Sequence, residues 1–290
     1  MATRVRLPGA HPVGDPRDPA IGIEAEGKSS DTGERDQGAL IVPDTRFLIA
    51  SVPYFGPLFR LFRQSWVAFS PMKPRAMVSW SGGKDCYLAL TRVRESFEIA
   101  GLLTMMTEDG RRSRSHGLRP ELLQAQAKLL GLPLLTEPAT WADYEAGFGK
   151  LLARARALGA THIIFGDIYP EANRIWAETA SARQGLTAVE PLWAESTEKI
   201  AREFLSTQST AIITTVRDVH LDQSYLGKAF SYQLVDVFLA KEIDPCGERG
   251  EFHTFVTRFG QVDESIPVTT GAIHKVGGCS AIDLSLSAAW

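Results

Sequence analysis

Residues 77–93, MVSWSGGKDCYLALTRV, decide the fold of this chain. Its first residues form an apolar run typical of a buried parallel strand, and those from Asp85 onward have the spacing of an amphipathic helix. Between them lies the segment SGGKDC at residues 81–86. A loop that leaves the carboxyl end of a parallel strand and enters a helix gathers free backbone N–H groups, and anions bind at such points. The stretch therefore predicts a phosphate-binding loop.

Several features of this loop favour phosphate. Gly82 and Gly83 allow close backbone approach, so that successive N–H groups can form an anion-binding nest. A helix dipole alone contributes only about 0.3–1 kcal/mol, so the nest, the Ser81 hydroxyl and the Lys84 ammonium must supply most of the attraction. The loop does not match GxxxxGK[ST], which disfavours the common kinase and GTPase mechanism. A purely structural Gly-Gly turn is the alternative.

The composition is that of an ordinary globular protein, with 290 residues, 44% hydrophobic and 22% charged. The formal net charge of -3 lacks a basic excess, which disfavours nucleic acid as a partner, although a local basic patch stays compatible with it. The three cysteines are far apart and form no CxxC, so we expect no disulfide scaffold or structural zinc site and a reducing, cytoplasmic setting. Neither a membrane span of ~20 apolar residues nor a secretory signal is predicted.

Residues 1–74 differ from the rest of the chain. Nine of the sixteen prolines precede residue 75, and residues 1–43 have neither helical nor strand periodicity. We therefore expect a largely disordered or irregular N-terminal extension. A second interpretation stays open, in which translation of the natural protein starts at Met72 or Met77, beside the first well-patterned strand.

From residue 76 onward, short apolar runs alternate with amphipathic helical patterns, as in parallel strands joined by crossover helices. The predicted strands are 76–80, 99–107, 134–136 and 161–165, and the helices between them are 85–97, 119–130 and 144–158. Farther along the chain the predicted helices are 171–184, 196–207 and 226–241, the predicted strands are 210–216 and 251–259, and the Gly-rich tail is strand-like at best. The pattern indicates an α/β protein.

Several motifs together resemble one family. SGGKDC at residues 81–86 is similar to the pyrophosphate loop, SGGxDS, of the adenine nucleotide alpha-hydrolase superfamily. The motifs SHG at 115–117, FGDI at 165–168, EPLW at 190–193 and above all CGERGEFHTFV at 246–256 resemble the diphthine-ammonia ligase family and its bacterial relatives. The resemblance covers residues 76–256, and its last motif is the most specific.

The resemblance implies a Rossmann-like open parallel sheet of five strands, with a pyrophosphate-loop ATP-binding domain at residues 75–185 and a C-terminal substrate-binding α/β portion at residues 186–290. It also implies the reaction and its cofactors, ATP and Mg²⁺. ATP adenylates a carboxylate, pyrophosphate leaves, and ammonia attacks the acyl-adenylate to give an amide. The loop would then grip the departing pyrophosphate and stabilise its charge.

We assign ATP binding to ten residues of the loop and of two later motifs, namely Ser81, Gly82, Gly83, Lys84, Asp85, Cys86, His116, Gly117, Gly166 and Asp167. Lys84 is also a candidate catalytic residue and Asp85 a candidate magnesium ligand, although Asp85 could simply be a helix N-terminal acid. Asp167 follows a predicted strand at the edge where open α/β sheets bind ligands, with a turn cap as the alternative. A surface loop is the alternative for His116 and Gly117.

Cys86 departs from the serine of the family motif. A thiol is a poorer hydrogen-bond donor than a hydroxyl, so we expect weaker phosphate binding there, or binding by the backbone N–H alone. A catalytic thiolate, favoured by the helix N-terminus and by Lys84, is a further alternative.

The CGERGE segment is the second candidate site. Glu248 and Glu251 are candidate catalytic residues that could coordinate magnesium, bind ammonium or accept its proton, whereas a glycine turn with salt-bridged acids is the structural alternative. The candidate substrate-binding residues are Arg174, Trp176, Cys246, Gly247, Glu248, Gly250, Glu251, His253 and Thr254. For Arg174 and Trp176, a helix face with one buried aromatic residue is the alternative.

The leading hypothesis is an ATP-dependent, AMP-forming amide ligase with ATP, ammonium and a carboxylate as its substrates. The carboxylate is diphthine on elongation factor 2 if the family's function holds. Bacteria lack diphthamide although bacterial relatives share these motifs, so a different carboxylate substrate is the alternative. A tRNA-modifying enzyme of the same superfamily is one alternative, although no CxxC and no basic excess support it. A non-catalytic ATP-binding sensor is the other, supported by Cys86. No glutaminase signature is visible, so free ammonium is the expected nitrogen donor.

Overall fold

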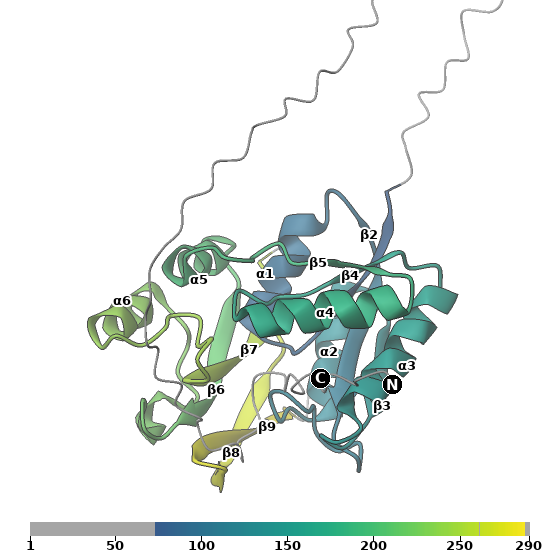
Figure 1. The fold of residues 1–290 in the computed structure, drawn as a ribbon. Helices are drawn as coiled ribbons and strands as arrows, with labels where there is room; N and C mark the ends of the chain where they lie inside the picture. Colours follow the sequence, from purple (N-terminus) through teal and green to yellow (C-terminus); the bar gives the residue numbers. More distant parts are fainter. Residues whose placement is uncertain (1–72, 261, 288–290) are drawn as a thin grey trace, which may run out of the picture. The chain divides into compact units, whose positions relative to one another are not determined.

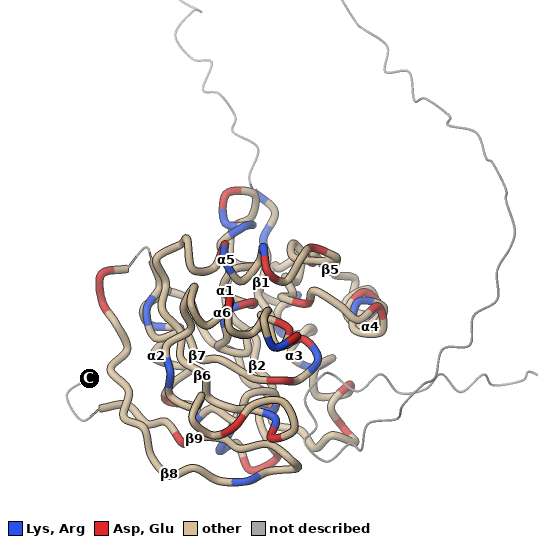
Figure 2. The backbone as a smooth tube through the Cα atoms, turned by 90° about the vertical axis from the view of Figure 1, so that its left-hand side faces the viewer, with Lys and Arg blue, Asp and Glu red and all other residues tan. Residues whose placement is uncertain are grey.

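The computed structural model of the chain describes residues 73–260 and 262–287. The two interpretations of the N-terminal extension concern residues 1–72, which lie outside these ranges. Within the described ranges, no helix is long and apolar enough to cross a membrane. Lysine and arginine are interspersed with aspartate and glutamate over the described part of the chain (Figure 2).

The first half of the described chain forms a five-stranded, fully parallel sheet in the order β3-β2-β1-β4-β5 (Figure 1). Its strands are β1 (Arg75–Ser79), β2 (Glu98–Met106), β3 (Leu134–Pro138), β4 (His162–Ile164) and β5 (Thr187–Val189). The predicted open parallel sheet of five strands is thus confirmed. The strand order reverses beside the central strand β1, and such a switch point opens a crevice at the carboxyl ends of the strands.

Helices cover both faces of this sheet (Figure 1). α1 (Lys84–Val93) and α2 (Pro120–Leu130) pack on one face, and α3 (Tyr144–Ala157) and α4 (Glu171–Arg183) pack on the other. Successive side chains of β1 alternate between the faces, because Ala76 and Val78 belong to the core with α1, whereas Met77 belongs to the core with Phe148. A sheet buried on both faces explains the continuous apolar run at residues 76–78.

The second half forms a four-stranded antiparallel sheet in the order β7-β6-β9-β8. Its strands are β6 (Thr210–Arg217), β7 (Phe252–Arg258), β8 (Val268–Val276) and β9 (Cys279–Leu286). The helices α5 (Thr197–Ser206) and α6 (Tyr232–Ala240) share a hydrophobic core with β6 and β7. Ser196 caps α5 as its side chain accepts the N–H of Lys199. The Gly-rich tail, expected to be strand-like at best, forms the hairpin β8–β9.

Two elements differ from the sequence-based expectation. The helix expected at 226–241 begins only at Tyr232, because the preceding residues run along β6: Gly227 has a φ of +74° and the N–H of Phe230 donates to the carbonyl of Ala211 (2.8 Å). The short strand β5 was not predicted from its own residues, since only three residues pair with β4 and their identity carries no clear strand signal.

A buried glutamine joins the two halves. Gln126 of α2 accepts the indole N–H of Trp80 (2.8 Å), and its amide nitrogen donates to the carbonyls of Gly82 (3.0 Å) and Val256 (2.8 Å). The N–H of Val256 in turn donates to the carbonyl of Gly82 (3.0 Å). The antiparallel sheet is therefore hydrogen-bonded directly to the SGGKDC loop.

Replacing Gln126 with alanine is expected to destabilise the protein. The change removes three hydrogen bonds and leaves the Trp80 indole N–H buried without a partner, while the Gly82 carbonyl keeps only the bond from the Val256 N–H, which together costs about 2–4 kcal/mol. Urea unfolding followed by circular dichroism measures the free energy. Gln124→Ala is the matched control, because Gln124 is exposed on the same helix, and equal effects of the two substitutions would contradict the prediction.

Candidate functional site

The loop between β1 and α1 depends on its two glycines. Gly82 has a φ of +84°, a left-handed conformation that favours glycine, and a Cβ there would lie 2.9 Å from Oε1 of Gln126. A Cβ on Gly83 would lie 2.7 Å from Cε1 of His116. The backbone of the loop can therefore approach its neighbours only because both side chains are missing.

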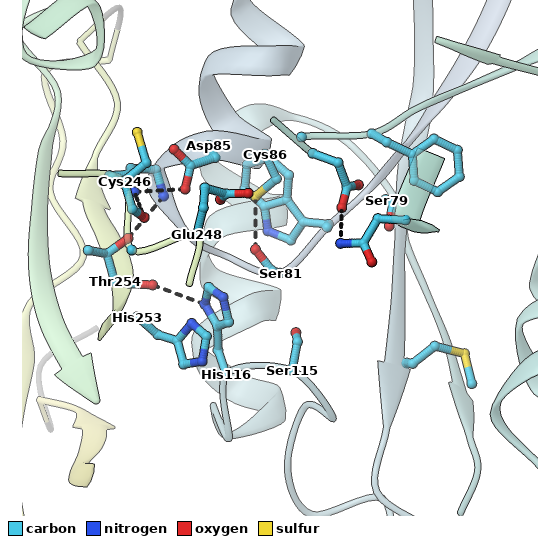
Figure 3. A pocket seen from close by; sticks show the side chains of 18 of the residues that line it. Ser79, Ser81, Asp85, Cys86, Ser115, His116, Cys246, Glu248, His253 and Thr254 are labelled. Atoms are coloured by element: carbon cyan, nitrogen blue, oxygen red, sulfur yellow. Dashed lines mark hydrogen bonds and ion pairs between the residues drawn. The ribbon is translucent and has the colours of Figure 1, made fainter. Parts of the chain in front are cut away.

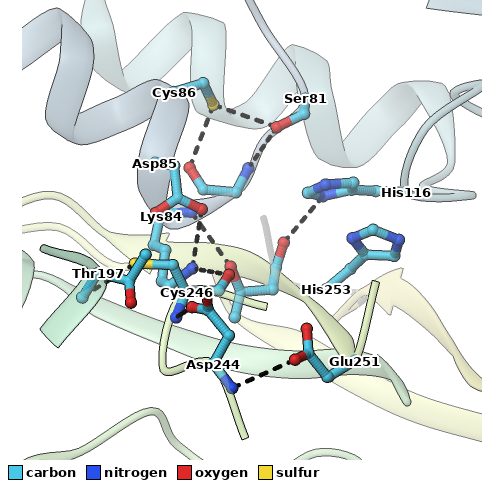
Figure 4. A network of polar contacts seen from close by, with 12 residues as sticks. Ser81, Lys84, Asp85, Cys86, His116, Thr197, Asp244, Cys246, Glu251 and His253 are labelled. Atoms are coloured by element: carbon cyan, nitrogen blue, oxygen red, sulfur yellow. Dashed lines mark hydrogen bonds and ion pairs between the residues drawn. The ribbon is translucent and has the colours of Figure 1, made fainter. Parts of the chain in front are cut away.

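Cys86 closes a ring of hydrogen bonds within the loop (Figure 4). The N–H of Gly83 donates to Oγ of Ser81 (3.3 Å), the Ser81 hydroxyl donates to Sγ of Cys86 (3.4 Å), and the thiol donates to the Gly83 carbonyl (3.1 Å). Burial raises the pKa of the Cys86 thiol, so the thiol keeps the proton that the ring requires. At this position the thiol accepts one hydrogen bond and donates one, as a hydroxyl would.

Lys84 joins the loop to the C-terminal half. Its side chain is buried, and Nζ donates to Oδ2 of Asp85 (2.8 Å) and to the carbonyl of Cys246 (2.6 Å). The same Nζ lies 5.6 Å and 5.3 Å from the ring centres of Phe230 and Phe252. Burial disfavours the ammonium, but its acidic neighbours, with Asp85 foremost, together outweigh this effect and raise the pKa of Lys84. The charge of Lys84 therefore persists inside the fold.

The segment 244–251 is a turn held by its own acids (Figure 4). Oδ1 of Asp244 accepts the N–H of Cys246 (2.7 Å), and the two carboxylate oxygens of Glu251 accept the N–H groups of Asp244 (3.2 Å) and Arg249 (3.0 Å). Gly247 has a φ of +75°, and a Cβ there would lie 2.6 Å from the carbonyl oxygen of Phe252. The structure thus places the carboxylate of Glu251 beneath the turn, where it holds backbone.

A stacked pair of histidines forms another wall of the site (Figure 3). The ring centres of His116 and His253 lie 4.4 Å apart, and Nδ1 of His116 lies 3.1 Å from the carbonyl of Thr254. Because a carbonyl only accepts, Nδ1 carries the proton and Nε2 is left as an acceptor. Burial lowers the pKa of His116 well below its usual value and that of His253 to about 4, so both rings are neutral at pH 7. Thr254 also anchors the loop, since its Oγ1 accepts the backbone N–H of Lys84 (3.1 Å).

The loop, the turn and the histidine pair surround a cavity of about 200 Å³. Its polar end is lined by residues of the loop and of the turn, including Ser81, Asp85 and Glu248 (Figure 3). Its opposite end is apolar and largely aromatic, and is lined by Leu103, Met105, Tyr144, Phe148, Phe165 and Trp176. A cavity with one polar, loop-lined end and one flat-sided apolar end suits a nucleotide, whose phosphates and base need these two environments.

Three carboxyl groups line this cavity. Asp167 accepts the side-chain amide of Asn173 (3.1 Å), and Oδ1 of Asp85 is buried without a hydrogen-bond partner among the described residues. Burial, together with the nearby Asp85 carboxylate, raises the pKa of Glu248 well above its usual value. Within residues 73–260 and 262–287, no three His, Cys, Asp or Glu side chains are grouped to hold a metal ion by themselves. Mg²⁺ commonly takes one or two carboxylates and completes its shell with phosphate oxygens, which the unpartnered oxygen of Asp85 fits.

The structure brings most of the predicted site residues to this one cavity. Those that line it are Ser81, Lys84, Asp85, Cys86, His116, Gly166, Asp167, Trp176, Cys246, Gly247, Glu248, His253 and Thr254. Gly82 and Gly83 belong to the loop but do not line the cavity themselves, and Gly117 and Gly250 line a neighbouring cavity. Arg174 lies outside both, where Nε donates to Glu178 (2.9 Å) and the guanidinium stacks on Trp193.

Glu190 was not singled out from the sequence as a site residue. Both of its carboxylate oxygens are buried, and neither has a hydrogen-bond partner in the part of the chain that the structure describes. Burial beside Asp167 raises its pKa to about 7. A positional signal was available, because Glu190 directly follows β5 at the carboxyl edge of the sheet and opens the EPLW motif.

Two family models match the chain. The diphthamide synthase N-terminal domain matches residues 72–188, and the diphthamide synthase C-terminal domain matches residues 196–268. Together they cover more than half of the chain, and the first contains the SGGKDC loop while the second contains the CGERGE turn.

Similar curated proteins include two named diphthine–ammonia ligase. The one from Schizosaccharomyces pombe is 25% identical over 202 residues, which are 61% of this chain and 33% of that protein, so the chain spans about a third of its length. The one from Rattus norvegicus is 24% identical over 235 residues, which are 70% of this chain and 86% of that protein. A solved structure described as a predicted subunit of tRNA methyltransferase from Methanocaldococcus jannaschii is 14% identical, with a TM-score of 0.37, over 64% of this chain and 97% of that one.

Replacing Glu190 with glutamine is expected to stabilise the protein at high pH only. The pKa of Glu190 is raised from 4.5 to about 7, so the folded state binds its proton more tightly than the unfolded chain and loses stability as pH rises through this interval. We expect Glu190→Gln to raise the Tm by about 2 °C at pH 8, after allowing for solvent screening, and by nothing at pH 4.

Differential scanning fluorimetry across this pH range measures the effect. Glu95→Gln is the control, because the Glu95 side chain is 91% exposed and should show no such pH dependence. A gain for Glu190→Gln that is equal at both pH values would contradict the prediction.

Proposed function

Because the chain belongs to the diphthamide synthase family, we propose that it is an ATP-dependent ligase that adenylates a carboxylate and amidates it with ammonia. The observation that carries this proposal is the buried bond between Lys84 and the Cys246 carbonyl (2.6 Å). It fixes a phosphate-type loop and a turn with an acidic side chain around the same cavity. A site that binds only phosphate would need the loop but not the turn with its acidic side chain.

The nucleotide occupies the cavity with its base at the aromatic end and its β- and γ-phosphates at the loop. The N–H groups of Gly83 and Lys84 already donate to Ser81 and Thr254, so the loop offers the following N–H groups at the start of α1, the Ser81 hydroxyl and the charge of Lys84. Mg²⁺ bound at Asp85 would neutralise phosphate charge. In this pose the departing pyrophosphate is the group that the loop stabilises, which favours cleavage between the α- and β-phosphates.

The reaction has two steps. A carboxylate oxygen attacks the α-phosphorus, and the bond from that phosphorus to the bridging oxygen breaks to release pyrophosphate. The lone pair of ammonia then attacks the acyl carbon, the C–O bond to AMP breaks, and the nitrogen loses a proton. Glu248 is the proposed acceptor of that proton, because its carboxyl group lines the cavity and, once ionised, a carboxylate with a raised pKa holds a proton more tightly than an ordinary one. Glu251 is proposed to position the turn.

The names of the relatives suggest diphthine as the carboxylate, a modified side chain of elongation factor 2. The ring of hydrogen bonds at Cys86 supports a working loop over a non-catalytic sensor, because the thiol fills both roles that a serine hydroxyl would have. The cysteines argue against the tRNA-modifying alternative. A reactive thiol should be accessible, whereas all three cysteines of the chain are buried.

The products of ATP turnover test the proposal directly. With ATP, Mg²⁺, ammonium and a pool of carboxylic acids from cell extract, we expect ³¹P NMR to show AMP and pyrophosphate, with ¹⁵N from labelled ammonium appearing in an amide. ADP and orthophosphate as the products would overturn adenylation. The variant Glu248→Gln serves as the control for contaminating ATPases, and we expect it to lose about 100-fold in amide formation.

Replacing Gly83 with alanine is expected to weaken nucleotide binding. The new Cβ would lie 2.7 Å from His116 and would displace the loop or the ring. We expect the affinity for α,β-methylene-ATP, measured by calorimetry, to fall by about tenfold or more. Gly149→Ala is the control, because a Cβ there would meet only Nε2 of Gln184 at 3.9 Å. Unchanged affinity in Gly83→Ala would place the phosphates elsewhere.

Cys86 provides a further test of the loop. A serine can accept from Ser81 and donate to the Gly83 carbonyl, so Cys86→Ser should keep the affinity for α,β-methylene-ATP within about threefold. Alanine can do neither, so Cys86→Ala should lower it by about tenfold. A large loss in the serine variant would mean that the sulfur itself has a role.

A further inference from the structure

The loop that follows β4 and the turn at 244–251 are two parts of the same cavity wall. The loop carries Asp167 and the turn carries Glu248, and both side chains line the cavity of about 200 Å³. The two carboxyl groups are close enough to affect each other, because the charge of Asp167 contributes to the raised pKa of Glu248. The arrangement of the cavity therefore depends on how the loop and the turn are held together.

Tyr169 joins the loop to the turn. Its hydroxyl donates to Oδ2 of Asp244, a buried side chain at the start of the turn. The same hydroxyl is hydrogen-bonded to the guanidinium of Arg249, farther along the turn. A phenolic hydroxyl can donate one hydrogen bond and accept another at the same time. One side chain of the loop therefore holds both ends of the segment that carries Cys246 and Glu248.

The Tyr169 hydroxyl keeps the proton that this arrangement requires. Burial and the Asp244 carboxylate raise the pKa of Tyr169, and the neighbouring charge of Arg249 only partly offsets them. The ring is half-buried and packs against the hydrophobic core on the α1 side of the sheet. A phenylalanine at this position would keep the packing of the ring and lose only the hydrogen bonds.

The contact continues through Asp244 to the phosphate-type loop. Oδ1 of Asp244 accepts the N–H of Cys246 (2.7 Å), and the Cys246 carbonyl accepts Nζ of Lys84 (2.6 Å). Lys84 thus holds the middle of the turn from the β1 loop, while Tyr169 holds its ends from the β4 loop. Glu248 lies in the segment between these attachments, so its position at the cavity depends on both.

We propose that Tyr169 is a positioning residue, which holds the turn so that Glu248 is placed at the cavity to accept the proton of the attacking ammonia. The inference rests on the proposed ligase function and deepens it. Tyr169 does not itself line the cavity, so it acts through the turn without touching the substrates. Its hydroxyl should therefore matter for amide formation and much less for adenylation.

Labelling of Cys246 tests the contact without turnover. Cys246 is buried in the turn, and Cys279 on β9 is a buried thiol outside it. A buried thiol reacts with N-ethylmaleimide when the segment around it opens. We expect Tyr169→Phe to speed the labelling of Cys246 about tenfold relative to Cys279, as followed by peptide mass spectrometry. Global destabilisation would speed both thiols, and an unchanged ratio would overturn the proposal.

Two further variants make the labelling specific. Tyr232→Phe is the matched control, because the Tyr232 ring is 44% exposed on α6, and it should leave the ratio unchanged. Arg249→Met should raise the ratio less than Tyr169→Phe and should add nothing in the Tyr169→Phe background, since both changes break one contact. Equal effects of Tyr169→Phe and Tyr232→Phe, or additive effects of Tyr169→Phe and Arg249→Met, would contradict the assignment.

Two partial reactions then separate positioning from a general loss of activity. With carboxylic acids from cell extract as the acyl source, exchange of labelled pyrophosphate into ATP reports adenylation, and ¹⁵N incorporation from ammonium reports amide formation. For Tyr169→Phe, we expect the exchange rate to stay within about twofold and kcat/KM for ammonium to fall about tenfold. Equal losses in the two reactions would mean that the hydroxyl only stabilises the fold.

The proposed function and this inference fail in different ways. Faster Cys246 labelling in Tyr169→Phe, in a protein that never forms AMP, would reject the ligase function and leave the contact of Tyr169 with the turn. An AMP-forming enzyme in which Tyr169→Phe changes neither the labelling nor the use of ammonium would reject this inference alone.

Discussion

The buried ammonium of Lys84 is the contact on which the arrangement of the site depends. It belongs to the loop of the parallel sheet, yet it bonds to the carbonyl of Cys246 in the other half of the chain. Asp85 keeps it charged, and the aromatic rings beside it exclude water. A buried hydrogen bond from a charged group contributes about 1.5–3 kcal/mol, so this contact fixes the loop and the turn to each other.

The cavities on the two sides of the histidine pair have different linings. On one side, the cavity with Asp85, Asp167 and Glu248 is acidic and has an aromatic end, which suits a nucleotide with its metal ion and an ammonium. On the other side of His116 and His253, a second cavity of about 170 Å³ is lined by arginines and apolar side chains, and Asp283 pairs with two of these arginines. The two histidines, which are neutral, line both cavities.

Local sequence rules predict what depends on local residues. The apolar run before the glycines and the helix after them identify β1, the loop and α1, and Ser196 marks the start of α5. Tertiary contacts decide the rest. The Lys84 side chain turns away from solvent to a carbonyl 162 residues later, and Glu251 lies beneath its own turn, neither of which follows from spacing. The hydrogen bond from Nε of Arg217 to the Gly250 carbonyl likewise joins residues far apart in the sequence, which no local pattern predicts.

A crystal structure with Mg²⁺ and α,β-methylene-ATP tests the central claim most directly. The account predicts that the β- and γ-phosphates lie on the backbone N–H groups at the start of α1, that the α-phosphorus faces Glu248, and that the Lys84 ammonium still bonds to the Cys246 carbonyl. A triphosphate bound away from the loop, or an α-phosphorus turned away from the turn and the histidine pair, would contradict it.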